Sequence, residues 1–158
     1  MAFRRPRRGN ISLMKKIISL TTCFFILLIP ISVAFAQVPT RVRVIEASNV
    51  GSIIDPSLKD VQSDLKSLSN FTSYRLLKDE NLSLSPNRPI DVPVHKGRSL
   101  EITLVGQRKD IAECRVKIKS EGTDILNTQV RLSSGRTVLI VGPKHGEGVA
   151  IIALSARF

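Results

Sequence analysis

Few residues in this chain are suited to catalysis or metal binding. His95 and His145 are the only histidines, and Cys114 is one of two cysteines. These three side chains could in principle coordinate zinc, and an enzyme using both histidines with a loop carboxylate such as Glu147 is one alternative. Both histidines, however, fall in expected turns and Cys114 on the apolar face of an expected strand, whereas structural zinc ligands usually come in closely spaced pairs. We therefore predict no catalytic residues, no metal site and no cofactor.

A glycine-rich segment near the C-terminus is the favoured contact region. Residues 142–148 connect two apolar runs, Thr137–Val141 and Val149–Leu154, which are typical of central strands covered on both faces. Loops on rigid sheets often carry binding function. One predicted helix cannot cover both runs, so we expect either a residual apolar patch here or complete cover by a second sheet. The predicted partner contacts are Lys144, His145, Glu147 and Arg157.

The first 36 residues predict export. Basic residues Met14-Lys15-Lys16 precede an apolar stretch, Ile17–Ile29, and Ala34-Phe35-Ala36 provides the small residues that a signal peptidase recognises. We predict a signal peptide over residues 1–36, cleaved before Gln37, and a periplasmic or extracellular location. The residues before Met14 indicate either a true start at Met14, which we favour, or a twin-arginine signal.

The net charge changes when the signal is removed. The whole chain carries +11, but six of its 24 basic residues and none of its 13 acidic residues precede residue 37. The mature part, residues 37–158, is therefore a single domain of about +5. This mild charge favours a partner with an acidic surface, and argues against nucleic acid or membrane binding. Cys114 is its only cysteine, so the thiol is either a core residue or pairs between chains.

One helix is expected early in the mature domain. Asp55 is a good N-cap, and Pro56 suits the first helical position. Apolar residues then recur at helical spacing, which predicts an amphipathic helix at about 56–69. The apolar stripe consists of Leu58, Val61, Leu65 and Leu68.

The remaining sequence has the period-2 alternation of β-strands. Strands are expected at Val38–Glu46, Tyr74–Lys78, Leu82–Ser85, Ile90–Val94, Leu100–Leu104, Ala112–Lys119 and Asp124–Leu132, and in the two apolar runs above. Turns are expected at Gly97, Gly106, Gly122, Gly135 and Gly146. The predicted fold is α+β, with one amphipathic helix packed on a mainly antiparallel β-sandwich or small barrel of about seven to eight strands.

Two C-terminal segments carry local resemblances. Residues Arg131–Gly142 contain a G-x-T-V-x-I-x-G run and resemble a strand–turn–strand unit near the end of secretin pore domains. The last nine residues, ending in Phe158, resemble the assembly signal of outer-membrane barrels. Both resemblances imply an outer-membrane or secretin-associated component. The order of signal, strand, capped helix and β-domain is similar to small exported bacterial β-domain proteins.

These features favour a binding role. A predicted export signal, a β-rich domain and no catalytic constellation indicate an exported, non-enzymatic interaction or assembly module. Its expected partner is a larger periplasmic or envelope protein complex.

Overall fold

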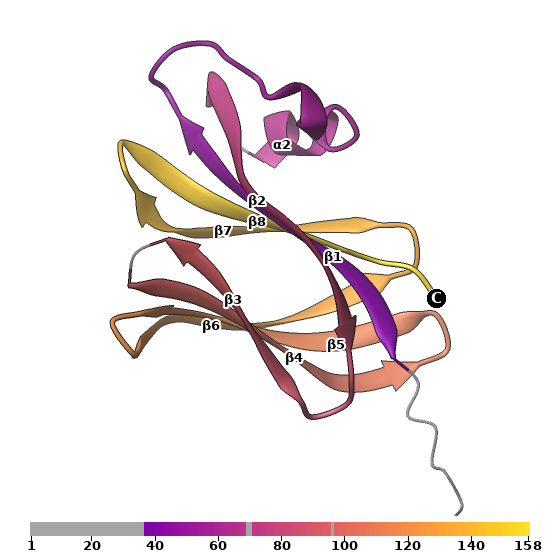
Figure 1. Cartoon of the computed structure of the whole chain (residues 1–158). Helices are drawn as coiled ribbons and strands as arrows, with labels where there is room; N and C mark the ends of the chain where they lie inside the picture. Colours follow the sequence, from indigo (N-terminus) through magenta and orange to yellow (C-terminus); the bar gives the residue numbers. More distant parts are fainter. Residues whose placement is uncertain (1–36, 69–70, 96) are drawn as a thin grey trace, which may run out of the picture. The chain divides into compact units, whose positions relative to one another are not determined.

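The protein contains eight strands and a short helical segment. The computed structural model describes residues 37–68, 71–95 and 97–158, so the predicted signal peptide at residues 1–36 lies outside the described residues. Within them, strand covers most of the chain (Figure 1). The elements are β1 Val38–Ser48, a 3-10 turn at Pro56–Leu58, α2 Gln62–Leu68, β2 Ser73–Leu84, β3 Pro89–His95, β4 Arg98–Arg108, β5 Ile111–Ser120, β6 Thr123–Ser133, β7 Thr137–His145 and β8 Gly148–Ala156.

The strands form two four-stranded antiparallel sheets. Sheet A has the order β2-β1-β8-β7, and sheet B has the order β3-β4-β5-β6. Sheet A thus joins the first two strands to the last two, whereas sheet B is a meander of consecutive hairpins. The predicted antiparallel sandwich is confirmed, and the small closed barrel offered as its alternative is wrong, because each sheet ends in two edge strands.

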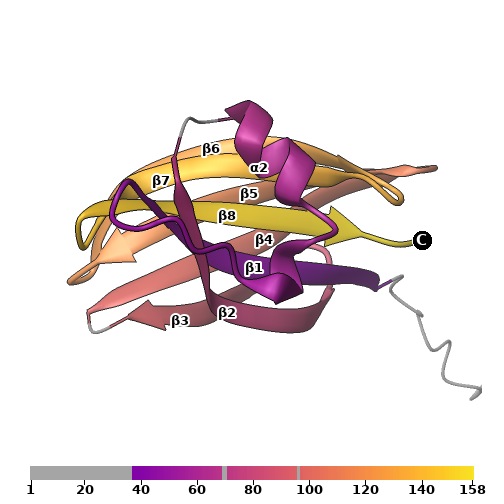
Figure 2. The ribbon, with the colours of Figure 1, turned by 90° about the horizontal axis from the view of Figure 1, so that it is seen from above.

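Two apolar clusters stabilise this arrangement. The larger one fills the space between the sheets and includes Val42 and Leu154 of sheet A with Ile102 and Val116 of sheet B. The second lies on the face of sheet A that points away from sheet B, which we call the outer face. There the helical segment covers apolar residues of β1, β2 and β8 (Figure 2). Within the described residues, no helix is long and apolar enough to cross a lipid bilayer.

The predicted helix at 56–69 is wrong in its continuity. Asp55 does cap it, since its carboxylate accepts a hydrogen bond from the Ser57 amide at 2.9 Å. The helix nevertheless stops after Leu58 and resumes at residue 62. The interruption contains Asp60, whose carboxylate bonds to Arg43 on the sheet. A tertiary contact here overrides local helical preference.

The predicted apolar stripe of the helix is buried at three of its four positions. Leu58, Val61 and Leu65 pack on sheet A, whereas Leu68 is 41% exposed.

Three expectations about the sheets also need correction. The two short strands expected within residues 74–85 are one strand, β2, because β1 pairs with it along its whole length. Gly106 lies in β4 at a bulge rather than in a turn. The run in β7 is at the edge of sheet A, although Val138 and Leu139 still pack on opposite faces.

Candidate functional site

The four predicted contact residues are not gathered in one place. Lys144 and His145 end β7 and Glu147 lies in the following turn, whereas Arg157 follows β8 at the opposite end of the same hairpin. The register shows this separation, because Lys144 is paired with Val149 and the far end of β7 is paired with Ser155. The structure therefore divides these residues among different surfaces.

His95 and His145 meet where β3 ends near the β7–β8 turn. Their ring centroids are 5.3 Å apart in an edge-to-face arrangement. Arg98 Nη1 donates to the carbonyl oxygen of Lys144 at 2.7 Å, which fixes the same contact. Among the residues that the structure describes, no three His, Cys, Asp or Glu side chains are grouped so as to hold a metal ion. The two histidines thus come together without the third ligand that a catalytic zinc needs.

Cys114 takes no part in this contact, because its side chain is fully buried in the core between the sheets. Burial raises the pKa of its thiol to about 11. A thiol of this kind is protonated at neutral pH and behaves as a small apolar core residue.

A first hollow lies beside the loop that follows β1, and we call it the loop groove. Its volume is about 670 Å³, and its lining includes Glu46, Val50, Ile53, Asp55 and Glu147. Val50 is 61% exposed and Ile53 is 74% exposed. The β7–β8 turn forms the other side of the groove, so Glu147 is the predicted contact residue found there.

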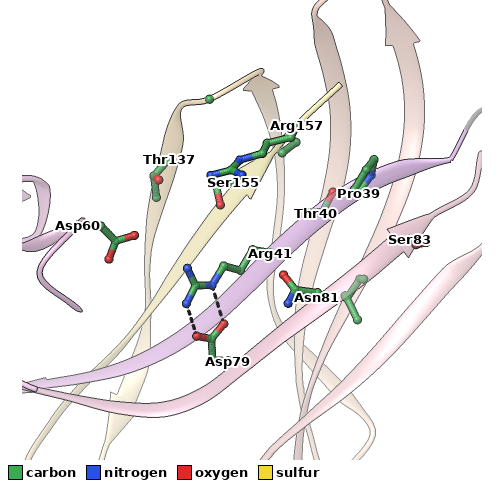
Figure 3. A pocket seen from close by; sticks show the side chains of 13 residues that line it. Pro39, Thr40, Arg41, Asp60, Asp79, Asn81, Ser83, Thr137, Ser155 and Arg157 are labelled. Carbon is green, nitrogen blue, oxygen red and sulfur yellow. Dashed lines mark hydrogen bonds and ion pairs between the residues drawn. The ribbon is translucent and has the colours of Figure 1, made fainter. Parts of the chain in front are cut away.

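A second hollow, the sheet groove, lies on the outer face of sheet A beside Asp60, which stands between the 3-10 turn and α2. Its volume is about 780 Å³. Four polar residues, one from each strand, form a row across its floor, since Asn81 pairs with Arg41, Arg41 with Ser155 and Ser155 with Thr137. Neighbouring strands are about 4.8 Å apart, so the row spans about 14 Å. Arg157 lies above Ser155, and Asp79 faces Arg41 (Figure 3).

Two ion pairs organise the charges of the sheet groove. Arg41 donates to Asp79 from Nε at 2.9 Å and from Nη2 at 2.5 Å. Arg43, which is only 2% exposed, donates from Nη1 to Asp60 at 2.7 Å. These hydrogen bonds hold the pKa of both carboxyl groups below the usual range. Both carboxyl groups are therefore ionised at neutral pH.

Sequence reasoning missed most of this groove. The alternation in Val38–Glu46 predicted a strand but not the position of its arginines, and Arg43 is buried beneath the helical segment. Sequence reasoning also left Asp79 in a connection between two strands. Basic residues alternating in one strand and an acidic residue in the next were the available signal, but only the β1–β2 register shows that they pair.

Comparisons with protein-family models, with curated proteins and with solved structures find no match to this chain.

Proposed function

We propose that this protein is an exported, non-enzymatic interaction module that binds a larger envelope protein through the loop groove. The observation that supports it is the exposure of Val50 and Ile53, two large apolar side chains three positions apart beside a hollow. Exposed apolar clusters next to polar residues are typical of protein–protein contacts. Export is supported by the signal sequence predicted over residues 1–36.

The charges of the loop groove indicate the chemistry of the partner. Three carboxylates line it, those of Glu46, Asp55 and Glu147, together with the single guanidinium of Arg75. Arg75 forms an ion pair with Glu46, and Asp55 is engaged in capping. Glu147 has no ion pair within the described residues. The complementary segment carries apolar side chains with a Lys or Arg placed to meet Glu147.

This partner differs from the acidic one expected from the net charge. The mature chain is mildly basic overall, but the loop groove has a local excess of carboxylates. Local charge decides which surfaces fit together, whereas the net charge acts mainly on long-range association.

Co-purification with a matched pair of variants tests the proposal. The bait is the full chain, expressed with its own N-terminal segment and recovered from envelope extract, and the captured protein is identified and then titrated in purified form. We expect Val50→Ser with Ile53→Ser to weaken binding of that protein at least about tenfold, because truncating a central apolar contact typically has this effect.

Ile125→Ser is the control, since Ile125 is also an exposed apolar residue but lies on β6 at the edge of sheet B. The Ile125→Ser variant should bind the captured protein normally. The unfolding temperatures of this variant and of the Val50→Ser, Ile53→Ser variant should differ from that of the parent by no more than about a degree or two. Equal binding by the loop variant and the control would place the contact elsewhere.

A further inference from the structure

The outer face of sheet A is covered over only part of its area. Under the helical segment it presents apolar residues such as Ile45, Ala47 and Ile151, which belong to the second apolar cluster. Beyond Arg43 the outward positions become polar, and the sheet groove opens there. The polar part is thus a recessed surface, bounded on one side by Asp60 of the helical segment (Figure 3).

One positive charge at the sheet groove, that of Arg157, is not compensated by the two ion pairs. Arg41 is neutralised by Asp79, and Arg43 by Asp60. Arg157 also lines the groove, and its side chain forms no ion pair with any residue that the structure describes. The groove therefore carries a surplus cation, which favours a negatively charged occupant.

Hydrogen-bond donors lie around this charge. Arg41 uses Nε and Nη2 for Asp79, and its Nη1 has no acceptor within the described part of the chain. The hydroxyl groups of Ser155 and Thr137 come from neighbouring strands and line the same hollow. Guanidinium and hydroxyl donors on one concave surface are the groups that recognise carboxylate and phosphate oxygens.

We propose that the sheet groove binds the carboxylate or phosphate group of a small polar molecule. Arg157 provides the charge, Nη1 of Arg41 donates from the floor, and Ser155 and Thr137 donate from their hydroxyl groups. The volume of about 780 Å³ lies in the range of small-molecule sites. No aromatic side chain is found among the described residues that line it, so the groove offers no aromatic surface on which a flat ring system could stack.

Titration followed by amide NMR tests this site on the purified protein. The probes are inorganic phosphate and D-glucuronate, with D-glucose as the neutral comparison. We expect saturable shifts at the amides of Arg41, Thr137, Ser155 and Arg157 with at least one anion and none with glucose, and weaker binding as salt is added. A response to phosphate alone identifies a phosphate ligand, and a response to glucuronate alone identifies a carboxylate.

A pair of charge-removing variants tests the role of Arg157. Arg157→Gln should weaken anion binding at least about tenfold, because a hydrogen bond to a charged group is lost. Arg115→Gln removes the same charge from an exposed position of sheet B and should bind as the parent does.

Two results would overturn the proposal: no saturable shift at these amides with either anion, or an equal loss in both arginine variants. The Val50→Ser, Ile53→Ser protein should bind the anion normally, so failure here is distinguishable from failure of the loop-groove proposal.

Discussion

Arg43 stands at the boundary between the apolar and polar parts of the outer face of sheet A. In the strand register it lies on β1 opposite Asp79 of β2 on one side, and opposite Ala153 of β8, a member of the apolar cluster, on the other. A fully buried guanidinium is tolerated only when its charge is compensated. Asp60 supplies this compensation from the helical segment, so one ion pair both neutralises Arg43 and attaches the helical segment to the sheet.

Removing the carboxylate of Asp60 should therefore destabilise the fold. We expect Asp60→Asn to lower the free energy of unfolding at pH 7 by about 1 kcal/mol. This value is below the usual range for a charged hydrogen bond because the side chain of Asp60 is 56% exposed and its charge is screened. Urea unfolding of the variant beside Asp110→Asn, an exposed aspartate in a turn, measures the difference.

The pH dependence of this effect has a definite sign. Arg43 holds the pKa of Asp60 below the usual value, so its stabilisation is complete above the unfolded-state pKa of about 3.9 and is lost as the pH falls through the lower folded-state pKa. The parent and Asp60→Asn should thus converge in stability at strongly acidic pH. A gap that persists there would mean that the ion pair is not its cause.

The sequence predicts the role of a residue where that role depends on its neighbours in the chain. The N-cap at Asp55 follows from the residues next to it, and the structure confirms it. For Cys114 the sequence left a core position and pairing between chains both open, and the structure buries it. The bond between Arg41 and Asp79 joins residues that are distant in sequence, so it depends on strand pairing. No periodic pattern specifies that register.

At the scale of elements, the start of β8 lies unusually close to β1. A Cβ atom at Gly148 would come within 2.0 Å of the Ala47 carbonyl oxygen. Only glycine allows this approach, and through it the β7–β8 hairpin keeps its position on sheet A.

Gly148→Ala should consequently be strongly destabilising. We expect a loss of about 3 kcal/mol, because backbone atoms would have to move to relieve the overlap. Gly106→Ala is the matched control, since its Cβ would meet only ordinary contacts with Glu113. Thermal and urea unfolding of both variants provide the comparison. A loss of stability in the control as large as that in Gly148→Ala would show that the close approach is not responsible.

Elements with a clear alternation were predicted well, and those shaped by distant partners were not. The alternating residues of β5 predicted a strand at Ala112–Lys119, and the structure has one at Ile111–Ser120. The middle of β2 is polar where it crosses the sheet groove. The alternation of apolar and polar residues is interrupted there, so the sequence predicted two short strands instead of one. The helical segment is divided at Asp60 by its contact with β1.

For the whole molecule, the topology makes folding depend on distant contacts. In sheet A, Thr40 is paired with Ala156, and these two residues are separated by almost the full length of the described chain. Folds dominated by such pairings form slowly, because chain closure costs entropy before the contacts stabilise the fold. The strand alternation and turn spacing indicated a sandwich or a small barrel, but the joining of first and last strands in one sheet could not be read from any local pattern.

Refolding should accordingly take milliseconds to seconds, as is typical of all-β sandwiches. Stopped-flow dilution from urea, followed by the fluorescence of Tyr74, measures the rate, since this buried tyrosine is the only one in the chain. Complete refolding within microseconds would contradict the expected dependence on the β1–β8 pairing.

The antiparallel pairing of β1 with β8 also determines how the domain responds to tension. Thr40 is opposite Ala156, so the chain enters and leaves the sandwich side by side (Figures 1 and 2). The hydrogen bonds of such a pair are perpendicular to the strands. A force pulling the two ends apart therefore opens these bonds one after another, as a zipper opens, instead of shearing them together. Anchored at one end and pulled at the other, this domain would yield at low force, whatever its thermodynamic stability.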